Sequence, residues 1–263
     1  MKMLFYKAWI ETRIRFVAGL IAATIICIYN IQQHAWLTAM WAAELANPHG
    51  YHMNWMPLGI HEYGWYLWHY LFNNYLQQVW ALFAVLFAFG GLIRERSSGT
   101  VLFSLGLPVS RARWLFTRLA VALFESIALS LFALVVVLIG SALIHQSFSV
   151  SQYLLHTALM IAAGIFIIAF GNLCYTLFPG NYLSLLLTLI LLGVPYLLLQ
   201  TYMQHLRYFN KTSWLAYFDF AHAMAGPWLL TFATTPWITL LIVWALTAIL
   251  LRVTLAFGDR LDY

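Results

Sequence analysis

The chain has 263 residues, of which 63% are hydrophobic and only 8% are charged, and its formal net charge is +5. Soluble domains carry roughly 25% charged residues, so this composition excludes a soluble globule and predicts a polytopic membrane protein. The positive charge does not indicate nucleic-acid binding. The basic residues cluster at the ends of apolar segments, where such residues set membrane topology and meet anionic lipid headgroups.

Residues 1–15 predict an interfacial helix before the first membrane span. Lys7, Glu11 and Arg15 recur every four residues and form a charged stripe along this helix. Such a helix would lie in the headgroup layer or pack beneath the bundle. We expect no cleavable signal peptide, because the first apolar run follows this charged lead-in and lacks a convincing small-residue cleavage site.

Six apolar runs approach or reach the roughly 20 residues that a helix needs to cross a bilayer. They are Phe16–Gln33, Leu76–Ile93, Leu119–Ile144, Tyr153–Phe178, Tyr182–Leu199 and Pro236–Phe257. The expected fold class is therefore an all-α polytopic membrane protein, with one transmembrane domain over residues 1–263. Two long segments on the outer side, 35–75 and 200–235, are too apolar to be disordered and are expected to form interfacial or re-entrant helices.

Glycine and proline mark two of these spans. Gly164 and Gly171 permit close helix contact in the fourth span, and Gly193 and Pro195 predict a kink in the fifth. Taken singly, each of these residues is equally typical of ordinary packing. Cys27 and Cys174 both fall inside apolar spans without neighbouring ligands, so we expect buried thiols rather than a disulfide or a metal site.

The distribution of basic residues predicts that both termini face the cytosol. With that orientation, all but two of the thirteen Lys and Arg lie on the inner side. The inner residues are Lys2, Lys7, Arg13, Arg15, Arg94, Arg96, Arg111, Arg113, Arg118, Arg252 and Arg260, and the outer ones are Arg207 and Lys211. This is the asymmetry of the positive-inside rule.

The segment 94–118, between the second and third predicted spans, has the punctuation of a short helix between two turns. Gly99 is suited to end one helix and Thr100 to cap a short new helix, Val101–Leu105. Gly106 and Pro108 would stop that helix, and Ser110 would cap the next one. From the residues alone, an ordinary cytosolic loop is an equally good interpretation.

The same segment resembles the hallmark of ABC-2 type permeases, the membrane subunits of a class of ATP-driven exporters. The resemblance is carried by Glu95-Arg96-x-x-Gly99-Thr100, followed by Leu-x-Leu-Pro108-Val109-Ser110-Arg111. It implies a coupling helix that docks into a groove on a separate ATP-binding subunit. The implied coupling residues are Arg94, Glu95, Arg96, Gly99, Thr100, Val101, Leu102, Leu105, Pro108, Ser110 and Arg111. One departure is Thr117-Arg118, where many relatives have Gly-Lys.

The resemblance also implies partners: two copies of a cytosolic ATP-binding subunit that hold ATP and Mg, and a second permease subunit in a homodimer or heterodimer. It implies export across a bacterial inner membrane, and the aromatic residues of the outer segment favour a hydrophobic or amphipathic substrate. A Walker A loop needs a glycine-rich run before its lysine, and none of Lys2, Lys7 and Lys211 follows one. We therefore expect no enzymatic activity and no cofactor in this chain, with ATP hydrolysis in the partner.

Glu125 is expected about two turns into the third span, where an ionised carboxylate costs roughly 2.5 to 3.5 kcal/mol. It should therefore face protein or water, either in a translocation path or dimer interface, or near the cytosolic boundary beside an arginine such as Arg118.

All nine histidines fall in predicted outer segments or in the outer parts of spans. His49, His52, His61 and His69 have the ligand type for a transition metal, but their spacing is loose. A pH-sensitive outer gate and packing at the membrane interface are the other interpretations. Two alternative functions follow: a membrane-embedded metal-binding protein or metalloenzyme, and a permease-like scaffold that senses a ligand.

Overall fold

The structure is a computed structural model that describes residues 2–45, 61–90, 111–178, 182–208 and 213–260. Every regular element within these ranges is helical, and no strand occurs among them. The expectation of an all-helical chain is confirmed for this part of the sequence.

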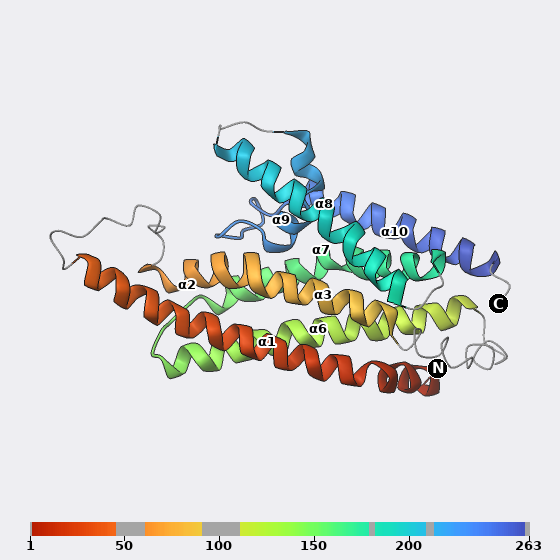
Figure 1. Cartoon of the computed structure of the whole chain (residues 1–263), viewed down its shortest axis with the longest axis horizontal. Coiled ribbons are helices and arrows are strands. Elements are labelled where there is room, and N and C mark those ends of the chain that lie inside the picture. Colours follow the sequence, from red (N-terminus) through yellow and green to blue (C-terminus); the bar gives the residue numbers. More distant parts are fainter. Residues whose placement is uncertain (1, 46–60, 91–110, 179–181, 209–212, 261–263) are drawn as a thin grey trace.

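Five helices in the described ranges are long and apolar enough to cross a membrane. They are α1 (Lys2–Leu45), α6 (Arg111–Leu143), α7 (Val150–Leu177), α8 (Tyr182–Tyr208) and α10 (Trp237–Arg260). The last four contain almost all of the third to sixth predicted spans. The start of α1 and the end of α10 lie at the same end of the bundle (Figure 1).

The second predicted span, 76–93, corresponds to α3 (Gln77–Phe89), while residues 91–93 lie outside the described ranges. Its 13 residues are too few to cross a bilayer alone. However, α3 continues without a break from α2 (Tyr63–Tyr66) and from the π-helix η2 (Leu67–Leu76). The helical run therefore covers residues 63–89.

The boundaries around the first outer segment differ from the prediction. Residues 35–45 belong to α1, and residues 63–75 are continuous with α3 instead of forming a separate interfacial helix. Polar and aromatic side chains lower the hydropathy of these stretches, which is why the predicted spans stop short. In the fold these side chains find partners: the Tyr66 hydroxyl donates to the Asn30 carbonyl at 3.0 Å, and the Tyr63 and Ser141 hydroxyls are 2.6 Å apart.

A separate interfacial helix over residues 1–15 is not confirmed. From Lys2, α1 runs unbroken through the first predicted span, and no glycine or proline interrupts residues 2–18. One face of this first part packs on α6, where Ala8 and Thr12 are buried. The first turns of α1 therefore have one face buried against α6, in addition to the charged stripe.

Within the second predicted outer segment, residues 200–208 continue α8 instead of beginning a separate element. After α8 come the 3-10 helix η3 (Trp214–Phe218) and α9 (Phe220–Ala225). The Asp219 carboxylate caps α9 by accepting from the backbone N–H of His222 at 3.0 Å. The short helix ends at Gly226, whose φ is 66°.

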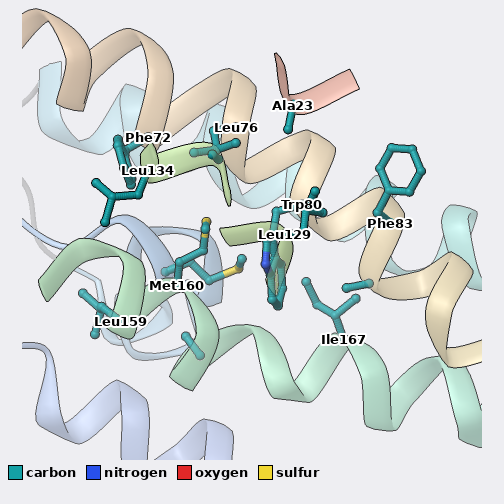
Figure 2. Close-up of a cluster of buried hydrophobic side chains, with 14 of the residues drawn as sticks. Ala23, Phe72, Leu76, Trp80, Phe83, Leu129, Leu134, Leu159, Met160 and Ile167 are labelled. Carbon is teal, nitrogen blue, oxygen red and sulfur yellow. The ribbon is translucent and has the colours of Figure 1, made fainter. Parts of the chain in front are cut away.

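The core is centred on α3, which packs against α1, α6 and α7. Trp80 is enclosed in this core, and its indole N–H donates to the Ser126 carbonyl of α6 at 3.1 Å. Figure 2 shows its ring beside Leu129 of α6 and Ile167 of α7. The helix α7 approaches the ring closely at Gly164, because this residue has no side chain. The close contact expected for Gly164 is confirmed.

Candidate functional site: the charged helix junction

The predicted coupling residues from Arg94 to Ser110 lie outside the described ranges, because residues 91–110 are not described. The backbone of Arg111 begins α6. The structure therefore describes the two helix ends that carry the 91–110 segment, namely the end of α3 and the start of α6. Both lie beside the first turns of α1, at the end of the bundle where α1 begins (Figure 1).

At the end of α3, the chain leaves the helix through Gly90. Its φ of 48° is a left-handed conformation that favours glycine. The Arg15 guanidinium of α1 donates to the carbonyls of Leu86 at 2.9 Å and of Gly90 at 2.5 Å. A cation at the last carbonyls of a helix also interacts favourably with the helix dipole. Arg15 thus fixes the end of α3 to α1.

At the start of α6, a second arginine makes the corresponding contact with α1. The Arg118 guanidinium lies 3.1 Å from the Glu11 carboxylate and 4.3 Å from the centre of the Trp114 ring. Its side chain is only 8% exposed, so the pair with Glu11 is largely shielded from water. Lys7 lies 3.8 Å from the other Glu11 oxygen and is more exposed. The pair of Glu11 with Arg118 fixes the start of α6 to α1.

Glu125 lies two helical turns further along α6 and is fully buried. Its Oε1 accepts a hydrogen bond from the Thr12 hydroxyl of α1. Within the described residues, its Oε2 has no hydrogen-bond partner. Glu125 thus faces protein inside the protomer, as its cost in a bilayer requires. Its role in a translocation path or dimer interface stays a prediction.

These contacts form one cluster, which we call the charged junction: Glu11, Thr12, Arg15, Arg118 and Glu125. Three helices meet there, and α1 supplies a partner to each of the other two. A displacement at either end of the 91–110 segment would therefore be transmitted to α1. The junction therefore connects α1 both to the end of α3 and to the start of α6.

The sequence pattern identified the charged stripe of α1 but not its partners. Spacing within one helix shows that Glu11 and Arg15 share a face, whereas it does not show which other helix covers that face. The pair formed by Arg118 and Glu11 was not predicted, although the sequence contains a signal for it. Two charges of opposite sign at the same expected membrane depth, on two neighbouring spans, are candidates for such a pair.

The histidine set gains no geometric support as a metal site. His49 and His52 lie outside the described ranges, and the described residues contain no group of three or more His, Cys, Asp or Glu that could hold a metal ion. His69 stacks on Trp65 with ring centres 4.7 Å apart, and His61 meets the edge of Trp41 at 5.9 Å. Cys27 and Cys174 are buried free thiols, as expected.

The first turns of α7 contain a polar contact set that the sequence did not indicate. His156 is fully buried, and its Nδ1 and Nε2 lie 2.8 Å and 3.3 Å from the carbonyl oxygens of Ala225 and Trp228. Gln152 both donates to the Leu230 carbonyl at 3.2 Å and accepts from the Leu230 N–H at 3.0 Å. These side chains hold the connection between α9 and α10 against α7.

No family model, no curated protein and no solved structure matches the chain. Interpretation of its function therefore depends on its own residues and geometry.

Proposed function

We propose that the chain is the membrane-spanning permease subunit of an ABC exporter, with six transmembrane helices. The sixth is the continuous helical run 63–89, added to the five long apolar helices. An even number of crossings agrees with the start of α1 and the end of α10 lying at one end of the bundle (Figure 1). Most of the basic residues belong to helix ends and segments at that end, which supports a cytosolic location for both termini.

The observation that carries the proposal is that the two helix ends flanking the hallmark-bearing 91–110 segment are both held to α1. Arg15 holds the last carbonyls of α3, and Glu11 pairs with Arg118 of α6. A loop that only connects two helices does not need both of its ends fixed to a third. A segment that receives force does, because force on a loosely attached segment would only bend its ends.

In this proposal, two cytosolic ATP-binding subunits dock on the coupling residues 94–111, chiefly on Val101–Leu105. ATP and Mg bind to those subunits and supply the energy. Their closure displaces the coupling helix, and the charged junction passes the displacement to α1, α3 and α6 together. A second permease subunit completes the path, and the cargo is hydrophobic or amphipathic. The bundle acts as a two-state element that the partner biases.

Affinity purification of the tagged chain from its native membrane in mild detergent tests the proposal. We expect an ATP-binding subunit to copurify in a one-to-one ratio, as identified by mass spectrometry. Gly99→Val should reduce its recovery, because a β-branched residue resists positive φ at the predicted turn. Absence of any ATP-binding subunit from the wild-type preparation would overturn the proposal.

The role of the charged junction is tested separately with Glu11→Gln, which keeps the shape of the side chain and removes its charge. We expect lower recovery of the ATP-binding subunit or a lower ATPase rate in the purified complex. Glu62→Gln is the matched control, because Glu62 is exposed and precedes α2 at the opposite end of the bundle. Equal recovery and equal ATPase rates for wild type and Glu11→Gln would show that the junction does not transmit force.

A further inference from the structure

A groove lies between part of α8 and the helices α3, α7 and α9. It has a volume of about 180 Å³ and is lined by residues of four helices, among them Val85 of α3, Ile167 of α7, Leu192 of α8 and Phe220 of α9. None of its lining residues belongs to the charged junction. The junction and the groove are therefore distinct sites.

The groove is apolar and has no charged residue among those that line it. Its polar side chains are Gln77, Gln78 and Tyr196. The Gln77 amide already donates to the Ala221 carbonyl at 2.8 Å, and the Gln78 amide donates to the Asn74 side chain at 2.8 Å. A ligand that needs a charged partner would find none here. The lining instead suits hydrocarbon.

The depth of the groove decides which molecules reach it. Ile167 lies near the middle of α7, and Leu192 lies near the middle of α8. Both helices are long and apolar enough to cross a membrane, so the groove lies at the level of the bilayer core. Molecules at that depth are mainly lipid chains, because water and polar solutes are excluded from it.

Part of this space stays open because α8 has a glycine, Gly193, among the residues that face the groove. Gly193 borders the groove, and a Cβ built on it would meet no atom within 4 Å. The neighbouring residues Leu191 and Val194 are 46% and 48% exposed, so the surface beside the groove is also apolar. An apolar cavity of about 150 Å³ accommodates a benzene ring in another protein, so this groove is large enough for part of an alkyl chain.

From this juxtaposition of apolar lining, bilayer depth and the missing side chain at Gly193, we propose that the groove binds one acyl chain of a bilayer lipid. The chain fills the space between α3 and α8 and supplies the packing that the protein itself lacks there. The proposal requires only that these helices cross a bilayer, and it does not depend on the exporter function. A failure of one proposal therefore leaves the other standing.

The test uses the full chain reconstituted in phosphatidylcholine nanodiscs that contain a phosphatidylcholine with a photoactivatable diazirine in the middle of one acyl chain. After illumination, mass spectrometry maps the labelled residues. We expect labelling of groove residues such as Leu82 and Leu192 to saturate as the probe fraction rises. Labelling of the lipid-facing Leu186 and Leu197 should rise in proportion to the probe fraction, because those residues meet only exchanging lipid.

Gly193→Phe is expected to fill the groove and lower labelling of Leu82 several-fold. Val194→Phe, which adds the same ring to the exposed face of α8, is the matched control and should leave that labelling unchanged. Groove labelling that does not saturate in the wild-type chain would overturn the proposal, even if the Gly193→Phe protein failed to fold. Absence of groove labelling at every probe fraction, with Leu186 and Leu197 still labelled, would also overturn it, because another surface would then exclude lipid from the groove.

Discussion

The helices α7 and α8 follow one another in the chain and are nearly equally apolar, yet α7 is largely buried in the bundle and α8 is largely exposed. In the most apolar window of α7, 56% of the residues are buried, against 12% in the corresponding window of α8. In α7, Gly164 lies against the Trp80 ring, whereas Gly193 of α8 borders open space. Hydropathy therefore identifies both helices as spans but does not show which one belongs to the core.

The difference bears on how a displacement would travel through the bundle. Because α3 ends at Gly90, beside the charged junction, motion of the 91–110 segment acts directly on α3. Close packing at Trp80 joins α3 to α7, so these two helices would move together. The groove separates much of α8 from them. In the proposed exporter, α8 is the helix that changes its distance from the core at the lowest cost.

The largest expected effect comes from adding one methyl group to α7. In Gly164→Ala, the new Cβ would collide with the Trp80 ring, which is enclosed and held by its bond to Ser126. Overpacking of this kind costs roughly 1–3 kcal/mol, and we expect about 3 kcal/mol here because the ring has little room to move. Thermal unfolding in detergent, followed by a thiol-reactive fluorophore, measures it through the buried Cys27 and Cys174.

A double variant distinguishes this clash from a general intolerance of α7 to change. In the background of Trp80→Leu, the ring is absent, so adding Ala at position 164 should cost much less than it does in the wild-type chain. Substitutions of residues in contact show such coupling, whereas the free-energy changes of substitutions at independent sites are additive. Equal costs in the two backgrounds would contradict the close contact between α3 and α7.

A smaller loss of stability is expected near the start of α7. His156→Phe keeps an aromatic ring in the buried position but removes both ring nitrogens from the carbonyls of Ala225 and Trp228. Leaving buried acceptors without a donor costs about 1–3 kcal/mol, and we expect about 2 kcal/mol in the same unfolding assay. His156→Gln retains an N–H donor and should recover part of the loss. If the His156→Phe and His156→Gln variants lose the same stability, the hydrogen bonds do not hold the connection between α9 and α10.

Much of this fold was predictable from local sequence, because the requirement for long apolar runs is itself local. The spans within α6, α7, α8 and α10 follow from this requirement. The close approach at Gly164 follows from another local property, the absence of a side chain at glycine. The continuity of α2, η2 and α3 was not predictable, because the polar side chains of residues 63–75 are tolerated only through partners on other helices. The pairing of Arg118 with Glu11 was not predictable for the same reason, because it too depends on a partner from another helix.

The smallest effect should occur on α8, and its sign is opposite. Gly193→Ala meets no atom within 4 Å and replaces a poor helix former with the best one, so we expect a gain of up to about 1 kcal/mol in the unfolding assay. A flexible acyl chain in the groove would accommodate one methyl group. A loss as large as that of Gly164→Ala would mean that a rigid surface, such as a second copy of the chain, packs against Gly193. The contrast between α7 and α8 would then apply to the isolated protomer and disappear in the assembly.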